Sequence, residues 1–338
     1  MKYIIDFKKL RSNYFSSNID SLLTLSISTT ILLIFVHLFN WVIFQAKWKV
    51  VSENIHIFAF GLYPIEEIWR PLTWLVILSI LSIFTFLNVP NFLPTRFLKV
   101  LWAIQLPLGT VLIAGGIGLE PVPSRDWGGI SLTLMLTLTS ALISLFTGIL
   151  LAIGRESNLI LLRRLCIFYI DTVRAFPLIT VLFFGQLLIP LFLPMEIEIN
   201  RVSRAIIAFS FFTSAYIAED IRGGLNSIPH TQREAAEVLG FNESQILQIV
   251  LLPQALRTAI PSLTNQLIGL LQNTSLMAVL GLVELMGIGR SILANPEFIG
   301  RYLEVYIFLA LIYWVLCTII ALISNNLESK VNFNLNRK

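Results

Sequence analysis

The chain has 338 residues, of which 56% are hydrophobic and 13% are charged, and its mean hydropathy is +0.80. Because a soluble globular protein carries about 25% charged residues, this composition excludes an ordinary soluble domain and indicates a chain surrounded by lipid. The net charge of +4 is modest, and in a membrane protein the placement of Lys and Arg is more informative than their sum.

Eight apolar segments are candidates for membrane spans. About 20 mostly apolar residues cross the hydrocarbon core as a helix, and lipid offers backbone polar groups no partner, so each span must be helical. The sequence therefore predicts an all-α membrane protein with about eight transmembrane helices, at residues 21–45, 72–90, 100–118, 128–154, 167–193, 203–222, 263–287 and 303–325. The second and third are short, and Pro107 interrupts the third.

The positive charges predict an orientation. If the N-terminus is cytoplasmic, the inner side of the eight-span arrangement carries twice as many Lys and Arg residues as the outer side. An excess of Lys and Arg in cytoplasmic loops is typical of multi-pass membrane proteins. We therefore expect both termini to be cytoplasmic.

Two segments between spans have a distinct composition. Residues 47–70 mix Trp48 and other aromatic residues with charges, which is typical of a segment at the membrane interface and equally of a connecting loop with aromatic anchors. Residues 120–127 contain two prolines and predict a rigid outer linker. This linker suggests a division into an N-terminal extension with three spans, residues 1–126, and a five-span core, residues 127–338.

The sequence offers no reactive group of its own. Cys166 and Cys317 lie in apolar surroundings and predict neither a disulfide framework nor a metal site, and the three histidines are scattered. A phosphate-binding loop would end in Gly-Lys-Ser or Gly-Lys-Thr, and the sequence contains neither. We therefore expect no catalytic residue, no metal and no cofactor, and any ATPase that drives this protein must be another chain.

Residues 229–261 are too polar to span a membrane and carry turn and capping signals. A proline opens the segment and should end the sixth helix. Thr231 and Glu234 have the spacing of a capping box, in which the hydroxyl accepts from one backbone N–H and the glutamate from another. We predict a short helix over residues 232–239 that ends at Gly240 in the left-handed conformation.

Asn242 and Gln245 repeat the capping-box spacing and predict a second helix over residues 243–252 that runs into Pro253. Two short capped helices joined by a glycine form a rigid elbow. The small side chains of the two alanines in the first helix would let another surface approach closely. On these grounds alone, the segment is equally a docking elbow or a well-formed loop.

The elbow resembles the EAA motif found in the permease subunits of ABC importers. The matching residues are Glu234, Ala235, Ala236, Gly240, Leu252 and Pro253. Val250 stands where that family usually has isoleucine. The resemblance implies that the elbow sits in a groove on a separate ATPase and moves with it when ATP binding closes the ATPase pair.

The residues around the elbow resemble the polar amino-acid branch of that family, of the histidine and glutamine type. The matches lie at residues 127–129, 173–178, 216–219, 222–224, 227–229, 253–257 and 273–276, so the resemblance covers about 127–325. Gln272 departs from the pattern, since the family often has lysine there. The N-terminal extension is similar to that of the larger permeases of general or basic/neutral amino-acid systems.

This resemblance implies a transmembrane permease subunit that translocates amino acids into the cytoplasm by alternating access, in the bacterial cytoplasmic (inner) membrane. The implied partners are ABC ATPase subunits, an extracytoplasmic solute-binding protein and a second permease subunit. The long N-terminal extension favours a different chain as the second permease, and a copy of this chain is the alternative. The last five spans would form the permease core.

Polar residues interrupt the seventh predicted span and are candidates for the translocation path. They are Asn265, Gln272, Asn273, Thr274 and Glu284. Asn265 and Gln272 are seven residues apart and share a helix face. The alternative for each is a hydrogen bond between packed helices.

Charged residues at the cytoplasmic ends of two spans have structural interpretations. Asp171 and Arg174 are one turn apart and predict an ion pair on one helix. Glu219, Asp220 and Arg222 close the sixth span, and we expect them to brace the elbow.

Three other classes of protein compete with an importer permease. An ion-driven secondary amino-acid transporter often has repeated halves, and residues 1–126 and 127–338 show no repeat. An intramembrane enzyme would need a clustered nucleophile and base, or metal ligands. A purely structural scaffold would have no ATPase partner.

Overall fold

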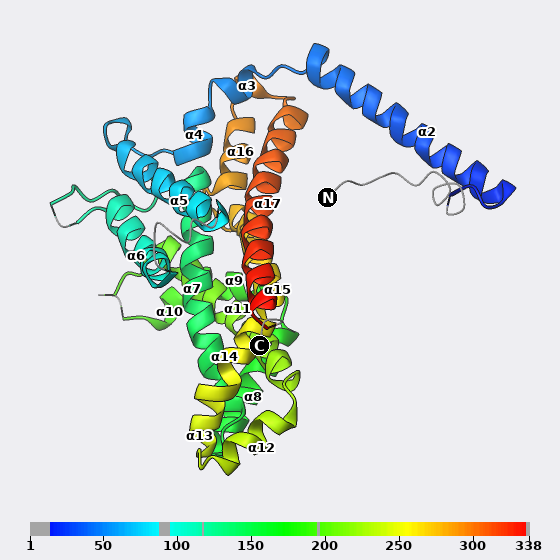
Figure 1. Cartoon of the computed structure of the whole chain (residues 1–338). Coiled ribbons are helices and arrows are strands. Elements are labelled where there is room, and N and C mark those ends of the chain that lie inside the picture. The colour runs from blue at the N-terminus through cyan, green and yellow to red at the C-terminus, as the bar shows by residue number, and fades with distance from the viewer. Residues whose placement is uncertain (1–13, 88–94, 117, 195–196, 336–338) are drawn as a thin grey trace. The chain divides into compact units, whose positions relative to one another are not determined.

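The computed structural model describes residues 14–87, 95–116, 118–194 and 197–335 (Figure 1). Within these ranges the regular structure is helical, and strand-like pairing is confined to three isolated bridges. The predicted all-α fold is therefore confirmed. Residues 88–90 of the second predicted span, residue 117 of the third and both chain ends lie outside the described residues. The chain divides into two compact units, Met1–Val50 and Val51–Lys338.

The first unit contains the first predicted span. Helix α2 (Asn18–Asn40) continues into a π-helical turn, η1 (Trp41–Gln45). Ser17 caps α2, because its hydroxyl accepts a hydrogen bond from the backbone N–H of Asp20 at 3.1 Å. This cap starts the helix three residues before the predicted boundary. Residues Asn18–Gln45 are long and apolar enough to cross a membrane.

The second unit begins with short helices that lead into a hairpin of two longer ones. Helix α3 (Lys49–Ser52) contains the boundary between the two units. After it come the short helices α4 (Ile55–Phe60) and η2 (Ile65–Glu67) and the longer α5 (Trp69–Leu87) and α6 (Thr95–Ala114). Helix α4 packs on α7 and α16. Phe58 of α4 is fully buried, and its ring meets that of Phe308 edge to face at 4.9 Å. This part of residues 47–70 is thus packed into the helical core.

Two long parallel helices, α7 (Gly129–Arg155) and α11 (Arg201–Asn226), form the centre of the second unit. Small residues let them approach closely. A Cβ added to Gly148 of α7 would lie 2.5 Å from the Ile217 side chain of α11. Ser140 and Ser144 of α7 and Ser210 of α11 are also buried. Small residues at such contacts are typical of helices that pack within membranes.

The fifth predicted span is bent, so the prediction of one continuous helix over 167–193 is wrong. Helix α8 (Ile160–Ala175) is followed, after a bend of 105°, by α9 (Leu178–Phe183), η3 (Phe184–Leu188) and α10 (Ile189–Phe192). The break falls at Pro177. Proline lacks the N–H that a continuing helix needs, and it forces the preceding residue into an extended conformation.

The rest of the chain contains a second bent pair, a short helix and a long final helix. The elements are α12 (His230–Val238), α13 (Glu243–Gln245), η4 (Ile246–Leu251), α14 (Leu252–Thr258), α15 (Ile260–Asn273), η5 (Thr274–Leu280), α16 (Leu285–Leu293), η6 (Pro296–Phe298) and α17 (Tyr302–Leu335). The chain bends by 59° between the helical segments Glu243–Thr258 and Ile260–Leu280. The predicted seventh span of 263–287 is too long, because Gly281 ends the helix with a left-handed φ of 81°.

Among the described residues, fewer than eight helices meet the length and apolarity of a membrane span. Four described helices are long and apolar enough to cross a membrane, or up to six if each bent pair counts as one span. The apolar part of α6, Val100–Ala114, is shorter than a full span. Helix α11 is long enough but more polar than these four. The predicted number of eight is therefore approximate.

Candidate functional site

The candidate coupling elbow, residues 229–258, lies at one end of the second unit, and α4 and α16 lie towards the other end (Figure 1). Its first helix, α12, begins at His230 with Pro229 as its N-cap, and no side chain caps it. The predicted Thr231–Glu234 capping box is therefore wrong. Proline suits the start of a helix because its φ is already fixed near the helical value, so Thr231 lies inside the first turn and cannot act as the cap.

Gly240 ends this first helix as predicted. Its φ is +82°, a left-handed value. The N–H of Phe241 donates to the carbonyl of Ala236 at 3.1 Å, which is the wider of the two hydrogen bonds of a Schellman motif. A Cβ added at Gly240 would meet no atom within 4 Å. Glycine is thus required here by backbone conformation rather than by lack of space.

The second half of the elbow keeps its predicted cap but has a different end. Asn242 and Gln245 form a reciprocal capping box, with hydrogen bonds of 2.9 and 3.0 Å. The predicted end at Pro253 is wrong, because helical structure continues through it to Thr258. The turn before Pro253 is π-helical, η4. Such a bulge accommodates a proline, which has no N–H for the carbonyl one turn earlier.

The elbow has a small hydrophobic core of its own. Ala236, Ile246 and Leu251 are buried against one another. Of the two alanines predicted to let another surface approach closely, Ala235 is exposed, whereas Ala236 faces the core of the elbow. An ion pair between Arg233 of α12 and Glu243 of α13, 3.0 Å apart, joins the two halves.

The exposed tip of the elbow is apolar. Val238 is 88% exposed and Leu239 is 76% exposed, and Glu234 is exposed on the same short helix. Two large apolar side chains on a solvent-facing turn are typical of a surface that a protein partner covers. These two residues were not among the predicted site residues, although two apolar residues directly before a helix-ending glycine in a polar loop were a signal.

The elbow is joined to the central helices by a close backbone contact. A Cβ added to Gly224 of α11 would lie 2.5 Å from the carbonyl oxygen of Ala255 in α14. Ala255 is fully buried. A displacement of α14 towards α11 is therefore passed on to the end of α11.

A cluster of charged residues ties α11 to α7 and α8 near the elbow. The carboxylate of Glu219 lies 3.1 Å from Arg155, 3.4 Å from Arg174 and 2.8 Å from Nε of Arg222. The predicted pair of Asp171 with Arg174 is wrong among the described residues, because Asp171 pairs with Arg155 at 3.8 Å. Arg174 turns instead towards Glu219 and lies over the ring of Tyr216. The cluster thus links the ends of three helices.

The predicted path residues fall into two groups. Asn265 and Gln272 are both exposed on α15, and Asn273 is half-buried. Thr274 is fully buried, and its hydroxyl donates to the carbonyl of Leu271 at 2.7 Å. The exposed pair shares a face, as expected from its spacing, whereas Thr274 satisfies the backbone of its own helix.

Glu284 does not join the polar residues of α15. It is fully buried and caps α16, accepting hydrogen bonds from the backbone N–H groups of Met286 and Gly287 at 2.9 Å each. The hydroxyl of Tyr313 in α17 donates to the same carboxylate at 3.1 Å. The carboxylate of Glu284 thereby holds α16 and α17 together. This role explains the burial of Glu284 without any contact with a substrate.

Comparisons with known proteins agree with the motifs. Residues 144–333 match the model of the family described as binding-protein-dependent transport system inner membrane component. The chain is 35% identical to the inner membrane amino-acid ABC transporter permease protein YhdY of Escherichia coli (strain K12), over 96% of this chain and 92% of that protein. It is 32% identical to the glutamate/glutamine/aspartate/asparagine transport system permease protein BztC of Rhodobacter capsulatus, over 85% of this chain and 79% of that protein.

A solved structure described as an amino acid ABC transporter with histidines has the same fold over part of the chain. The TM-score is 0.53 and the sequence identity 27%, and the match covers 59% of this chain and 90% of the other. The helical bundle and the capped elbow thus define a multi-pass transport component of the inner membrane. The chain belongs to the family of binding-protein-dependent transport system inner membrane components. The predicted family and the predicted role as an importer permease subunit are confirmed.

Proposed function

We propose that this permease imports amino acids into the cytoplasm, driven by ATP hydrolysis on separate ATPase subunits that hold the elbow. The observation that carries the proposal is the apolar tip at Val238 and Leu239 on a capped elbow with its own core. The names of the relatives YhdY and BztC support amino acids as the substrate class.

The route of coupling follows from the contacts of the elbow. An ATPase that holds the tip would move α12 and α13 as one body, because Arg233 pairs with Glu243 and Ala236 packs on Ile246. The contact of Ala255 with Gly224 would pass the movement to α11. The arginines around Glu219 would pass it on to α7 and α8. Glu234, Ala235, Gly240, Leu252 and Pro253 would belong to this coupling unit.

The proposed path runs along α15, with Asn265, Gln272 and Asn273 facing it. Polar side chains on a helix among membrane spans either line a watery path or bond to neighbouring helices. The exposure of both Asn265 and Gln272 favours the path for these two residues, and the Gln272 amide also donates to Sγ of Cys317 in α17 at 3.8 Å. We assign Thr274 and Glu284 to the support of that path, since both are buried and bonded within the protein.

The proposed assembly contains this permease, a second permease, two ATPase subunits and an extracytoplasmic solute-binding protein. Both termini would be cytoplasmic, an orientation supported by the excess of Lys and Arg on that side. The division into an extension, residues 1–126, and a core, residues 127–338, is supported by the family match at 144–333. A different chain as the second permease remains our preferred arrangement, because of the extension.

The proposal is tested by purifying the full chain from its membrane with whatever is bound and scanning amino acids for stimulation of ATPase activity in proteoliposomes. We expect an ATPase chain to co-purify and one or a few amino acids, delivered by the binding protein, to stimulate hydrolysis. Uptake that persists after ATP depletion, with the ion gradient intact, would instead identify an ion-driven transporter.

A further inference from the structure

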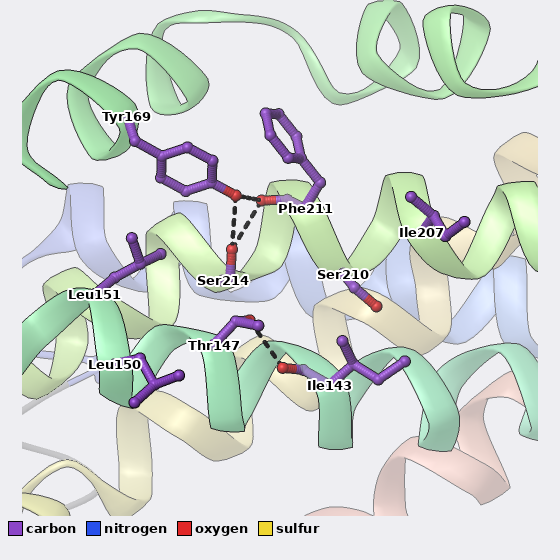
Figure 2. A pocket seen from close by; sticks show the side chains of 9 residues that line it. All are labelled: Ile143, Thr147, Leu150, Leu151, Tyr169, Ile207, Ser210, Phe211 and Ser214. Atoms are coloured by element: carbon purple, nitrogen blue, oxygen red, sulfur yellow. Dashed lines mark hydrogen bonds between the residues drawn. The ribbon is translucent and has the colours of Figure 1, made fainter. Parts of the chain in front are cut away.

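An open apolar groove with a volume of about 460 Å³ runs between α7, α8 and α11 (Figure 2). Its apolar lining includes Ile143 and Leu150 of α7 and Ile207 and Phe211 of α11, all of them exposed. A volume of this size lies within the range of pockets that hold small molecules, about 300–1,000 Å³. The groove is therefore large enough for a ligand.

The polar groups along the groove bond to the protein itself. Figure 2 shows the hydroxyl of Tyr169 donating to the carbonyl of Phe211, at 2.7 Å, beside the Ser214 hydroxyl at 2.9 Å. The hydroxyl of Thr147 donates to the carbonyl of Ile143 at 2.8 Å. Since these groups already have partners, the groove suits an apolar occupant. In a membrane-spanning core, the abundant occupant of that chemistry is an acyl chain of the surrounding lipid.

Two arginines lie beyond the C-terminal end of α7, the helix that lines one side of the groove. Along α7 the lining residue Leu151 is followed, about one turn later, by Arg155 at the end of the helix. Just beyond that end, Nε of Arg163 donates to the carbonyl of Ser157 at 3.1 Å, and Arg164 is its neighbour. Within the described residues, no carboxylate lies within ion-pair distance of Arg163 or Arg164, whereas Arg155 is paired.

The surface beside these two arginines is strongly apolar. Leu161, Leu165 and Phe168 of α8 are 73%, 57% and 70% exposed. A helix with exposed apolar residues and arginines without carboxylate partners is typical of an element at the boundary between acyl chains and headgroups. Arginine binds phosphate through its planar, multiply donating guanidinium group. The apolar groove thus suits the acyl chain of a phospholipid, and the arginines near the start of α8 suit its headgroup.

We propose that the groove between α7, α8 and α11 binds one acyl chain of an anionic phospholipid whose headgroup phosphate lies on Arg163 and Arg164. This inference rests on the proposed cytoplasmic position of the end of α7, since the cytoplasmic leaflet supplies anionic lipid. The lipid would cover the contact of Tyr169 with α11 and so hold α8 against the central helices.

The test is lipid retention by the full chain, measured by native mass spectrometry in mild detergent with added phosphatidylglycerol or phosphatidylethanolamine of the same acyl composition. We expect the wild type to retain phosphatidylglycerol about tenfold better, because each basic residue near an anionic headgroup strengthens binding several-fold. The Arg163→Gln/Arg164→Gln double variant should lose this preference. The matched double variant Arg125→Gln/Arg290→Gln, at two other exposed arginines, should keep it.

A second pair of variants tests the groove itself. Thr147→Phe places a ring in the groove and should lower retention of both lipids about tenfold. Ser79→Phe is the matched control, because Ser79 is an exposed residue of α5 with the same kind of bond to its own helix, and it should leave retention unchanged. Unchanged retention in Thr147→Phe, or equal retention of the two lipids by the wild type, would overturn the proposal.

A third measurement identifies the competing occupant. If the groove holds a helix of a second subunit, Ile207→Cys should crosslink to another chain in native membranes, and that result would also overturn the proposal. Lipid retention and crosslinking are both measured without transport. Failure of the lipid site is therefore distinguishable from failure of the proposed function, which would show as a missing ATPase partner with lipid retention intact.

Discussion

Gly224 of α11 lies so close to Ala255 of α14 that a Cβ at position 224 would be 2.5 Å from the Ala255 carbonyl oxygen. This contact joins the elbow to the central helices. We predict that Gly224→Val forces the two helices apart and lowers uptake at least tenfold, while the protein still reaches the membrane. Gly223→Val is the matched control, because a Cβ at Gly223 meets nothing within 4 Å. Equal uptake by both variants would remove the contact from the coupling route.

Gly240 supplies the left-handed residue at the tip of the elbow. We predict that Gly240→Val abolishes uptake without preventing membrane insertion, because a β-branched residue is strongly disfavoured at a φ of +82°. Gly240→Asn should keep most of the uptake, since asparagine tolerates this conformation. Uptake and membrane abundance are measured in the same cells. Normal uptake in Gly240→Val would exclude the docking role of the elbow.

The elbow also shows what could be predicted from sequence. The Asn242–Gln245 capping box and the left-handed glycine were predictable because each depends on residues within one turn. The Thr231–Glu234 box was not formed, since Pro229 competes for the same N-terminus and starts the helix earlier. Continuation through Pro253 was missed because a π-helical turn, η4, which the sequence does not signal, absorbs the proline.

Longer-range features were less predictable. The bend at Pro177 was recognisable as a proline signal, but the angle of 105° depends on the packing of α8 on α7 and α11. The partners of Glu219 come from three helices, so local spacing wrongly paired Asp171 with Arg174. Glu284 looked like a path residue because its cap is formed only where α16 begins after a break that the apolar pattern conceals.

Glu219 holds arginines from three helices and should matter more than its neighbour in the cluster, Asp171. We predict that Glu219→Gln lowers the Tm of the purified protein by several degrees and reduces the coupling of ATP hydrolysis to uptake. Arg174 and Arg222 would then lose their carboxylate partner, and Arg155 would keep only the longer pair with Asp171. Asp171→Asn should have a smaller effect, since Asp171 is 60% exposed and 3.8 Å from its partner. A larger fall in Tm for Asp171→Asn than for Glu219→Gln would contradict the assignment of Glu219 as the residue that holds the cluster together.

Variants of Glu284 and Gln272 distinguish a residue that supports the structure from a residue that lines the translocation path. We predict that Glu284→Gln weakens the α16 cap by about 1 kcal/mol, seen as a lower Tm, and leaves the order of preference among amino acids unchanged. Gln272→Leu should leave the Tm nearly unchanged and alter that order, because Gln272 is exposed on α15 and its one bond to another helix, to Sγ of Cys317, is a weak one of 3.8 Å. Unchanged selectivity in both variants would place Gln272 among residues that only bond helices together.

The central claim is that an ATPase holds this chain by the tip of the elbow, and it is tested most directly at Val238 and Leu239. The measurement is amino-acid-stimulated ATPase activity of the complex purified through this chain, with wild type compared to the double variant Val238→Asp/Leu239→Asp. Both side chains are largely exposed, so the change should leave the fold intact. The predicted result is a folded permease that has lost the ATPase chain and its activity. A variant that keeps a stable complex and full stimulation would contradict the account.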